Sequence, residues 1–130
     1  MTQIQDAKNL VQAHYAALAA ATPDTVTDIL TQRTSDDYLW RGVHPFNIQT
    51  GAKGAASAFW QPLLHSMTAI QRREDIFFAS MNEIDGFASV WTVSMGHLMG
   101  LFDAPFLNIP APRKIVMLRY AEFNRVEAGQ

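Results

Sequence analysis

Residues 114–126 read KIVMLRYAEFNRV and alternate as a β-strand does. Successive side chains of a strand point to opposite faces of its sheet. One face of this strand would carry Val116, Leu118, Tyr120 and Glu122, and the other Ile115, Met117, Arg119, Ala121 and Phe123. Glu122 is therefore a carboxylate on an otherwise apolar face, which makes it the first candidate for chemistry.

Two segments upstream alternate in the same way. We predict strands over residues 72–81 and from residue 87 to about residue 99, joined by a hairpin connection at residues 82–86. Asp85-Gly86 is the turn signal in that connection. Residues 100–112 contain three prolines and are predicted to form a loop.

The middle strand carries a second candidate. Trp91, Val93, Met95 and His97 share one face, so His97 is the polar member of an apolar row. If this face and the face of Glu122 both look into one pocket, an imidazole and a carboxylate meet there. A carboxylate in apolar surroundings is a better base, and an imidazole can donate a hydrogen bond to a developing enolate oxygen. Such a pair would suit proton abstraction next to a carbonyl.

Plainer interpretations of both residues stay open. Glu122 could pair with an arginine, since Arg41, Arg119 and Arg125 are all available. His97, in a glycine-rich strand end, could be a hydrogen-bonded structural residue.

The first part of the chain has helical spacing instead. A helix is predicted over residues 3–20, and one of its faces would carry Leu10, Val11, His14, Tyr15 and Leu18. We expect His14 to be a satisfied core or pocket-wall histidine. A short second helix is predicted to end at about Leu30, with Thr22 as its N-cap and Pro23 in its first position.

The segment that follows mixes signals. Residues 36–40 indicate a short strand, and residues 41–50 indicate a loop. Residues 51–67 are predicted to form a third helix, which Pro62 would bend or interrupt near Trp60.

Helices followed by a run of antiparallel strands indicate an α+β protein. We expect a cone-shaped barrel in which a curved, mainly antiparallel sheet wraps around about three helices. The open end of such a cone is a natural ligand pocket. A length of 130 residues predicts one domain, over residues 1–130.

Composition limits the partners that we expect. Ten Lys and Arg against twelve Asp and Glu give a net charge of −2, and the basic doublets at residues 72–73 and 113–114 are short, so no nucleic-acid partner is expected. The absence of cysteine excludes a disulfide framework and a thiolate site, and the four scattered histidines predict no metal site. No apolar run approaches the length of a membrane span and no signal-peptide pattern occurs, so we expect a cytoplasmic protein without a membrane partner.

Three segments together resemble a known family. Residues 91–97 (WTVSMGH), the proline-rich residues 105–112 and residues 120–126 (YAEFNRV) are similar to the SnoaL-like polyketide cyclases of the nuclear transport factor 2-like superfamily. The resemblance covers most of the chain and is strongest from Trp91 onward. It implies the cone-shaped α+β barrel and the closure of a polyketide ring by aldol condensation, with neither a metal nor an organic cofactor.

The resemblance also implies roles for individual residues. The acid of the family aligns with Glu122, which would remove the α-proton, and its histidine aligns with His97, which would assist at the carbonyl or enolate oxygen. A small apolar carbonyl compound would be the substrate. The expected walls of its pocket are Trp40, His44, Trp91, Met95, Leu118 and Tyr120, with His44 at the mouth.

Three departures separate this chain from the family pattern. Glu122 stands where the cyclases have Asp, and the extra methylene moves the carboxylate by about 1 Å, enough to change a rate strongly. Gly96 stands where many members have Thr. Residues 127–130 stand where the family turns and continues along its strand, so this chain would be a short version or a fragment.

Two other kinds of function fit the same pattern. One is a non-catalytic domain that binds a small molecule or associates with another protein. The other is an isomerase or dehydratase relative, which would need a second acid or a tyrosine in the pocket. In each case we expect a homodimer, because Ile115, Met117, Ala121 and Phe123 form an apolar strip on the outer face of the sheet.

Overall fold

The structure is a computed structural model that describes residues 3–127. Its elements, in chain order, are α1 (Gln3–Ala19), α2 (Val26–Arg33), β1 (Leu39–Arg41), β2 (Ile48–Thr50), α3 (Gly51–Ala55), η1 (Ala56–Trp60), α4 (Gln61–Ser66), β3 (Met67–Met81), β4 (Val90–Phe102) and β5 (Ile115–Val126). Residues 128–130, where the family would turn, lie outside the described part of the chain.

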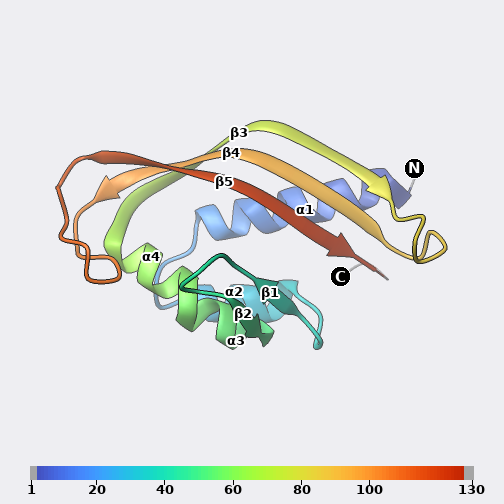
Figure 1. The fold of residues 1–130 in the computed structure, drawn as a ribbon, viewed down its shortest axis with the longest axis horizontal. Coiled ribbons are helices and arrows are strands. Elements are labelled where there is room, and N and C mark those ends of the chain that lie inside the picture. The colour runs from blue at the N-terminus through green and yellow to red at the C-terminus, as the bar shows by residue number, and fades with distance from the viewer. Residues whose placement is uncertain (1–2, 128–130) are drawn as a thin grey trace.

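A curved sheet of three antiparallel strands, in the order β3-β4-β5, arches over the helices (Figure 1). The short strands β1 and β2 pair as a separate antiparallel ribbon among the helices. The helices of residues 3–127 lie on the concave side of the long sheet, and none of them covers its convex side. The predicted α+β class and the curved sheet over helices are therefore confirmed.

Helix α1 packs along the concave side because its apolar residues recur at helical spacing. Ala7, Val11, Tyr15 and Leu18 are its buried residues, and they fall on one face of the helix. The first three form a core cluster with Val90 and Val126 from the ends of β4 and β5. The predicted helix over residues 3–20 is confirmed to within one residue.

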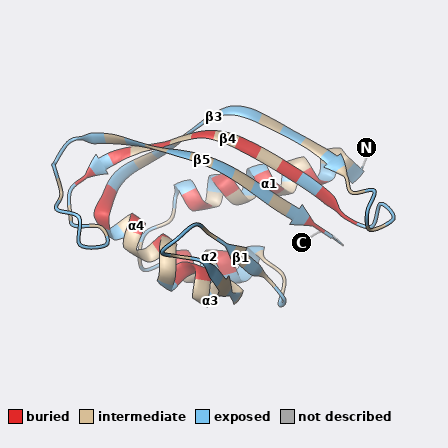
Figure 2. Ribbon diagram, viewed as in Figure 1, coloured by how far each residue is buried: buried red, intermediate tan, exposed pale blue. Residues whose placement is uncertain are grey.

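A second cluster fills the space between the other helices and the opposite half of the sheet. Its buried members are Leu18, Val26, Leu30, Ala55, Ala56, Trp60, Leu63, Met67, Leu98 and Phe102. Figure 2 shows buried positions along the central strand β4 and on the helix faces turned towards it. The two clusters meet in the C-terminal turns of α1, at Tyr15 and Leu18, where the candidate site lies.

Several predicted boundaries are wrong. Thr22 does not cap α2: the amide of Val26 donates to the carbonyl of Thr22, which makes residues 22–25 a turn, and the helix starts at Val26 and continues to Arg33. The predicted strand over residues 36–40 begins only at Leu39, because the residues before it form a turn.

The predicted loop over residues 41–50 contains a strand, β2, which pairs with β1. The long strands also extend beyond the predicted ends, since β3 begins at Met67 and β4 continues to Phe102. Strand pairing extends these elements past the residues whose alternation is visible in the sequence.

The third helix is interrupted as Pro62 predicts. The π-helical turn η1 ends at Trp60, and α4 begins at Gln61 with Pro62 in its first turn. The wider π-helical turn, in which the amide of Gln61 donates to the carbonyl of Ala56, accommodates a proline that has no amide proton of its own. The interruption leaves Trp60 buried, with its side chain turned into the core.

The register of the sheet decides which residues face the helices. Ser94 lies opposite Glu122, and Leu98 lies opposite Leu118, so these four residues share one face. In β4 that face is the buried one, comprising Val90, Thr92, Ser94, Gly96, Leu98, Gly100 and Phe102. The alternate residues of β4, His97 among them, lie on the convex face.

Candidate functional site

Glu122 projects from β5 to the concave side, and its carboxylate has partners from two elements. Its Oε1 atom lies 3.5 Å from Nη2 of Arg72 on β3. Its Oε2 atom accepts a hydrogen bond of 3.1 Å from the amide of Asn124, which also donates to the hydroxyl of Tyr15 at 2.9 Å. The side chain keeps 29% of its surface exposed, so the carboxylate is held in place yet open to a ligand.

Arg72 lies at the centre of the site. Its guanidinium carbon is 3.8 Å from the ring centroid of Tyr15 and 4.7 Å from that of Tyr120, and only 11% of the side chain is exposed. Stacking between two tyrosine rings fixes a guanidinium and stabilises its charge. Sequence reasoning missed this residue, because it treated Arg72 only as half of a basic doublet at the start of a strand. The arginines weighed as partners of Glu122, among them Arg41 and Arg119, do not contact it in the described part of the chain.

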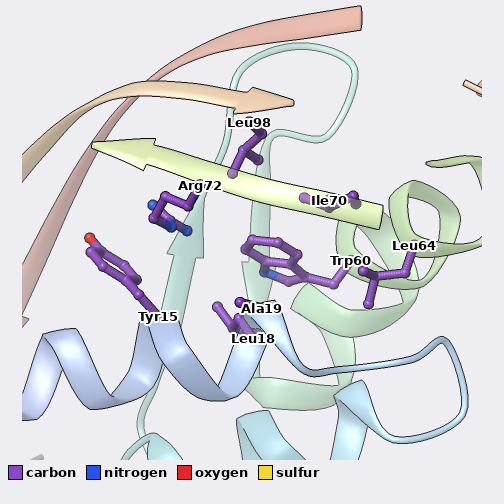
Figure 3. Close-up of a pocket in the computed structure, with 8 residues that line it drawn as sticks. All are labelled: Tyr15, Leu18, Ala19, Trp60, Leu64, Ile70, Arg72 and Leu98. Carbon is purple, nitrogen blue, oxygen red and sulfur yellow. The ribbon is translucent and has the colours of Figure 1, made fainter. Parts of the chain in front are cut away.

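An apolar hollow adjoins the guanidinium (Figure 3). Its lining residues are Tyr15, Leu18, Ala19, Trp60, Leu64, Ile70, Arg72 and Leu98. It has an empty volume of about 290 Å³ with the open space at its mouth included. Because that figure includes open solvent, the enclosed part is smaller, and the hollow suits only a small apolar group next to one cation.

A second carboxylate lies on the same side of the sheet. The fully buried Ser94 donates a hydrogen bond of 2.6 Å to Oε2 of Glu74, whose Oε1 accepts another of 2.9 Å from Gln12. The hydroxyls of Ser94 and Tyr120 are 2.8 Å apart. Because the one proton of Ser94 goes to Glu74, Tyr120 is the donor in that pair, and its ring is fixed against Arg72.

His14 belongs to this side as well, on the turn of α1 that carries Tyr15. Burial lowers the pKa of His14, and the charge of Glu122 opposes that effect while the charge of Arg72 adds to it. Its Nδ1 atom is buried and has no hydrogen-bond partner among the described residues. The expectation of a satisfied histidine is therefore wrong for this atom. For Tyr15 the effect of burial has the opposite sign: burial, followed by the charge of Glu122, raises the pKa of its hydroxyl.

His97 lies on the opposite face of the sheet from Glu122. It is in register with Arg73 and Arg119, and its Nδ1 atom lies 3.9 Å from the carboxylate of Asp75. The expectation that His97 and Glu122 meet in one pocket is wrong, because alternate residues of β4 point to opposite faces and Ser94 is the residue opposite Glu122. Trp91 and Met95, expected as walls of the same pocket, are on the convex face with His97.

The other expected wall residues also lie outside the lining of the hollow. Leu118 and Tyr120 are on the concave face and pack against the core. Trp40 stacks on Phe59 at a centroid distance of 5.2 Å and packs against the same core. His44 is exposed in the connection between β1 and β2.

Within residues 3–127, no three histidine, aspartate or glutamate side chains gather closely enough to hold a metal ion. None of the described helices has the length and apolar character needed to cross a membrane. The residues around Glu122 offer the chemistry of a carboxylate, a guanidinium held between two tyrosines and an apolar hollow.

The fold is that of the SnoaL-like polyketide cyclases. A candidate SnoaL-like polyketide cyclase from Jannaschia sp. CCS1 superposes with a TM-score of 0.69 at 17% sequence identity, over 100% of this chain and 83% of that protein. A candidate polyketide cyclase from Xanthomonas campestris pv. campestris superposes with a TM-score of 0.67 at 21% identity, over 99% of this chain and 87% of that protein. No family model and no curated protein matches the chain. The resemblance stated from the sequence is thus confirmed for the fold.

Proposed function

We propose that this protein binds a small, largely apolar carbonyl compound on the concave side of its sheet. Glu122 removes an α-proton from that compound, and the reaction is an aldol-type cyclisation or an isomerisation. One observation carries the proposal: Glu122 is a partly exposed carboxylate within 3.5 Å of Arg72, and Arg72 lines an apolar hollow. An apolar wall holds the body of a ligand, and a few polar groups orient its reactive part.

Glu122 is well placed to act as a base. Its Oε2 atom is oriented by Asn124, which is itself fixed by Tyr15 of α1. Such support holds a carboxylate in one position, on which general-base catalysis depends. The longer reach of Glu, compared with the Asp of the cyclases, places the carboxylate beside the guanidinium. His97 has no part in this proposal, because it lies on the other face of the sheet.

Exchange of the α-protons of a β-keto ester in heavy water, followed by proton NMR, tests the role of Glu122. The wild-type protein should accelerate exchange, and Glu122→Gln should lose about two to four orders of magnitude of that acceleration, the usual contribution of a general base. Glu127→Gln is the matched control, because Glu127 pairs with Arg125 at the exposed end of β5 and should leave exchange unchanged. A wild-type protein that exchanges no faster than Glu122→Gln would refute the proposal.

A non-catalytic domain that binds the same kind of ligand is the second candidate. The pairing of Glu122 with Arg72 and Asn124 favours it, since a carboxylate held on both oxygens can have a purely structural role. Binding of the keto ester without any acceleration of exchange would support this second candidate. The isomerase or dehydratase alternative has its second acid and its tyrosine in Glu74 and Tyr120, although these two are joined through Ser94. A cytoplasmic location stays a prediction.

We also propose that two copies of the chain pair through the convex faces of their sheets. The predicted apolar strip on β5 is exposed, with Phe123 at 63% and Met117 at 52%. Ile76 and Phe78 of β3 continue the exposed apolar surface across the same face. Apolar surface of this extent favours burial against a second, identical face.

Sedimentation velocity at micromolar concentration tests the pairing. The wild-type protein should sediment as a dimer and Phe123→Glu as a monomer, since a charge would then be buried in the interface. Ile84→Glu is the control: Ile84 is 97% exposed but lies in the β3–β4 connection, away from the convex face. A monomeric wild-type protein would contradict the proposal.

A further inference from the structure

We infer that Arg72 is a catalytic residue that binds the carbonyl oxygen of the ligand and stabilises the enolate formed there. The inference rests on the proposed function and extends it, because it assigns the oxyanion partner and defines the ligand as a neutral carbonyl compound. Arg72 is the cation that lines the hollow, and it has a base as its neighbour.

The position of the guanidinium suits a ligand in the hollow. The ring centroids of Tyr15 and Tyr120 lie 3.8 Å and 4.7 Å from its carbon, so two aromatic rings hold it in place. The N–H groups of a guanidinium point outward in its plane. In Figure 3 the guanidinium projects into the space between Tyr15 and Trp60, beside the hollow. An apolar group in the hollow would therefore bring an attached carbonyl oxygen to the edge of Arg72.

The guanidinium of Arg72 has unused hydrogen-bonding capacity. A guanidinium has five N–H donors. Within the described chain Arg72 hydrogen-bonds only Oε1 of Glu122, through two contacts of 3.5 Å each. Charge-assisted N–H···O bonds are normally about 2.7–2.9 Å long, so the contact with Glu122 is a loose one. A ligand oxygen can approach the guanidinium without breaking a tight ion pair.

The charges of Arg72, Glu122 and the ligand stay balanced during the proposed step. Before reaction, the positive charge of Arg72 faces the negative charge of Glu122 and a neutral ligand. When Glu122 takes the α-proton, the C–H bond breaks, an O–H bond forms on the carboxyl group, and the electron pair moves to the carbonyl oxygen. The negative charge therefore passes from Glu122 to the ligand oxygen, and the same guanidinium neutralises it in both states. Stabilisation of charge that develops in a preorganised site is what accelerates such a step.

The pairing of one guanidinium with one carboxylate also limits the charge that a ligand can carry. A ligand that arrives with its own carboxylate would place two negative charges beside one guanidinium, and like charges at close range are disfavoured. The site therefore suits a neutral ketone or ester with an apolar body small enough for the hollow.

Two measurements on the intact protein test the inference. The first is α-proton exchange of a β-keto ester in Arg72→Met and Arg72→Lys. We expect Arg72→Met to lose about a hundredfold in rate, the usual effect of removing one oxyanion donor. Arg72→Lys should also be slow, because an ammonium group neither stacks nor presents a fork of donors. Arg73→Met is the matched control, since Arg73 is exposed on the opposite face. Thermal unfolding checks that each variant is folded.

The second measurement is binding of 4-nitrophenolate, a stable anion that mimics an enolate and changes its absorption on binding. Glu122→Gln, which imitates the protonated base, should bind it at least about tenfold more tightly than the wild type, because the like charge is gone. The double variant Glu122→Gln with Arg72→Met should lose that gain.

Each outcome has one meaning. Loss of exchange in Arg72→Met, together with Arg72-dependent binding of the phenolate, supports the inference. Exchange that needs Glu122 but proceeds normally in both Arg72 variants overturns the inference and leaves the proposed function intact. Wild-type exchange no faster than that of Glu122→Gln removes the proposed function, and the enolate-binding role of Arg72 falls with it.

Discussion

Replacement of Gly96 by alanine is expected to destabilise the fold by about 3 kcal/mol or more, the upper range for forcing an extra group into a packed interior. Gly96 lies in the middle of β4, between Glu74 of β3 and Tyr120 of β5. A Cβ atom at this position would lie 1.9 Å from the carbonyl oxygen of Arg73 and 2.9 Å from its carbonyl carbon. Those are backbone atoms, so no side-chain rotation relieves the clash, and β3 would have to move where it carries Arg72.

Urea unfolding of Gly96→Ala against the wild type measures this effect. Gly54→Ala is the control: Gly54 lies in α3, and the nearest atom to its new Cβ would be Cβ of Gln49 at 3.5 Å, an ordinary contact. That variant should be stabilised by about 0.5–1 kcal/mol, as alanine is in a helix. A Gly96→Ala protein as stable as the wild type would show that β3 and β4 are not this close.

The close approach also bears on the threonine that the resemblance leads one to expect at this position. A Thr in place of Gly96 would meet the same carbonyl of Arg73. A register shift in β3 between Glu74 and Ile76 accompanies the approach. Such a bulge changes the direction of a strand and of the side chains near it. In this chain the bulge begins at Glu74, two residues after Arg72 on the same strand.

The sequence predicted well where one periodicity dominates. Helix α1 has a single apolar face, and the predicted strand over residues 114–126 differs from β5 (Ile115–Val126) by one residue. The concave position of Glu122 followed from alternation alone, because Leu118 and Tyr120 on the same face pack against the core. Local pattern is sufficient for such elements.

Strand β4 could not be predicted in the same way, because the large apolar residues that alternate in its middle lie on the convex face and not on the buried one. The buried row contains Thr92, Ser94 and Gly96, whereas the row on the convex face contains Trp91 and the half-buried Met95. Ser94 lies inside because its hydroxyl bonds Glu74 and Tyr120, and Gly96 lies inside because the backbone of β3 approaches it closely. This packing depends on contacts between residues far apart in sequence, which no local pattern contains. The error placed His97 beside Glu122 and left Arg72 unnoticed.

Replacement of Trp60 by alanine is expected to destabilise the protein by about 3–5 kcal/mol, the usual loss for a buried tryptophan. Trp60 is 7% exposed, packs edge-on against Phe59 at a centroid distance of 5.0 Å, and forms one wall of the hollow. Its removal would enlarge a mostly apolar space that opens beside Arg72. Added indole should fill that space and restore part of the stability, because a ligand that binds only the folded state stabilises it.

Trp91→Ala makes the same substitution on the convex face and decides between the two assignments of the pocket. Trp91 is 37% exposed in the single chain and lies opposite Arg125, so in the monomeric Phe123→Glu background its loss should destabilise by only about 1 kcal/mol. It leaves no enclosed space, and indole should therefore have no effect on that variant. Urea unfolding of both variants, with and without indole, measures the difference. Rescue of Trp91→Ala rather than Trp60→Ala would return the pocket to the face of His97, where hydrophobic alternation alone had placed it. Rescue confined to Trp60→Ala would show that the enclosed apolar space lies on the side of Arg72, where the proposed function puts the apolar body of the ligand.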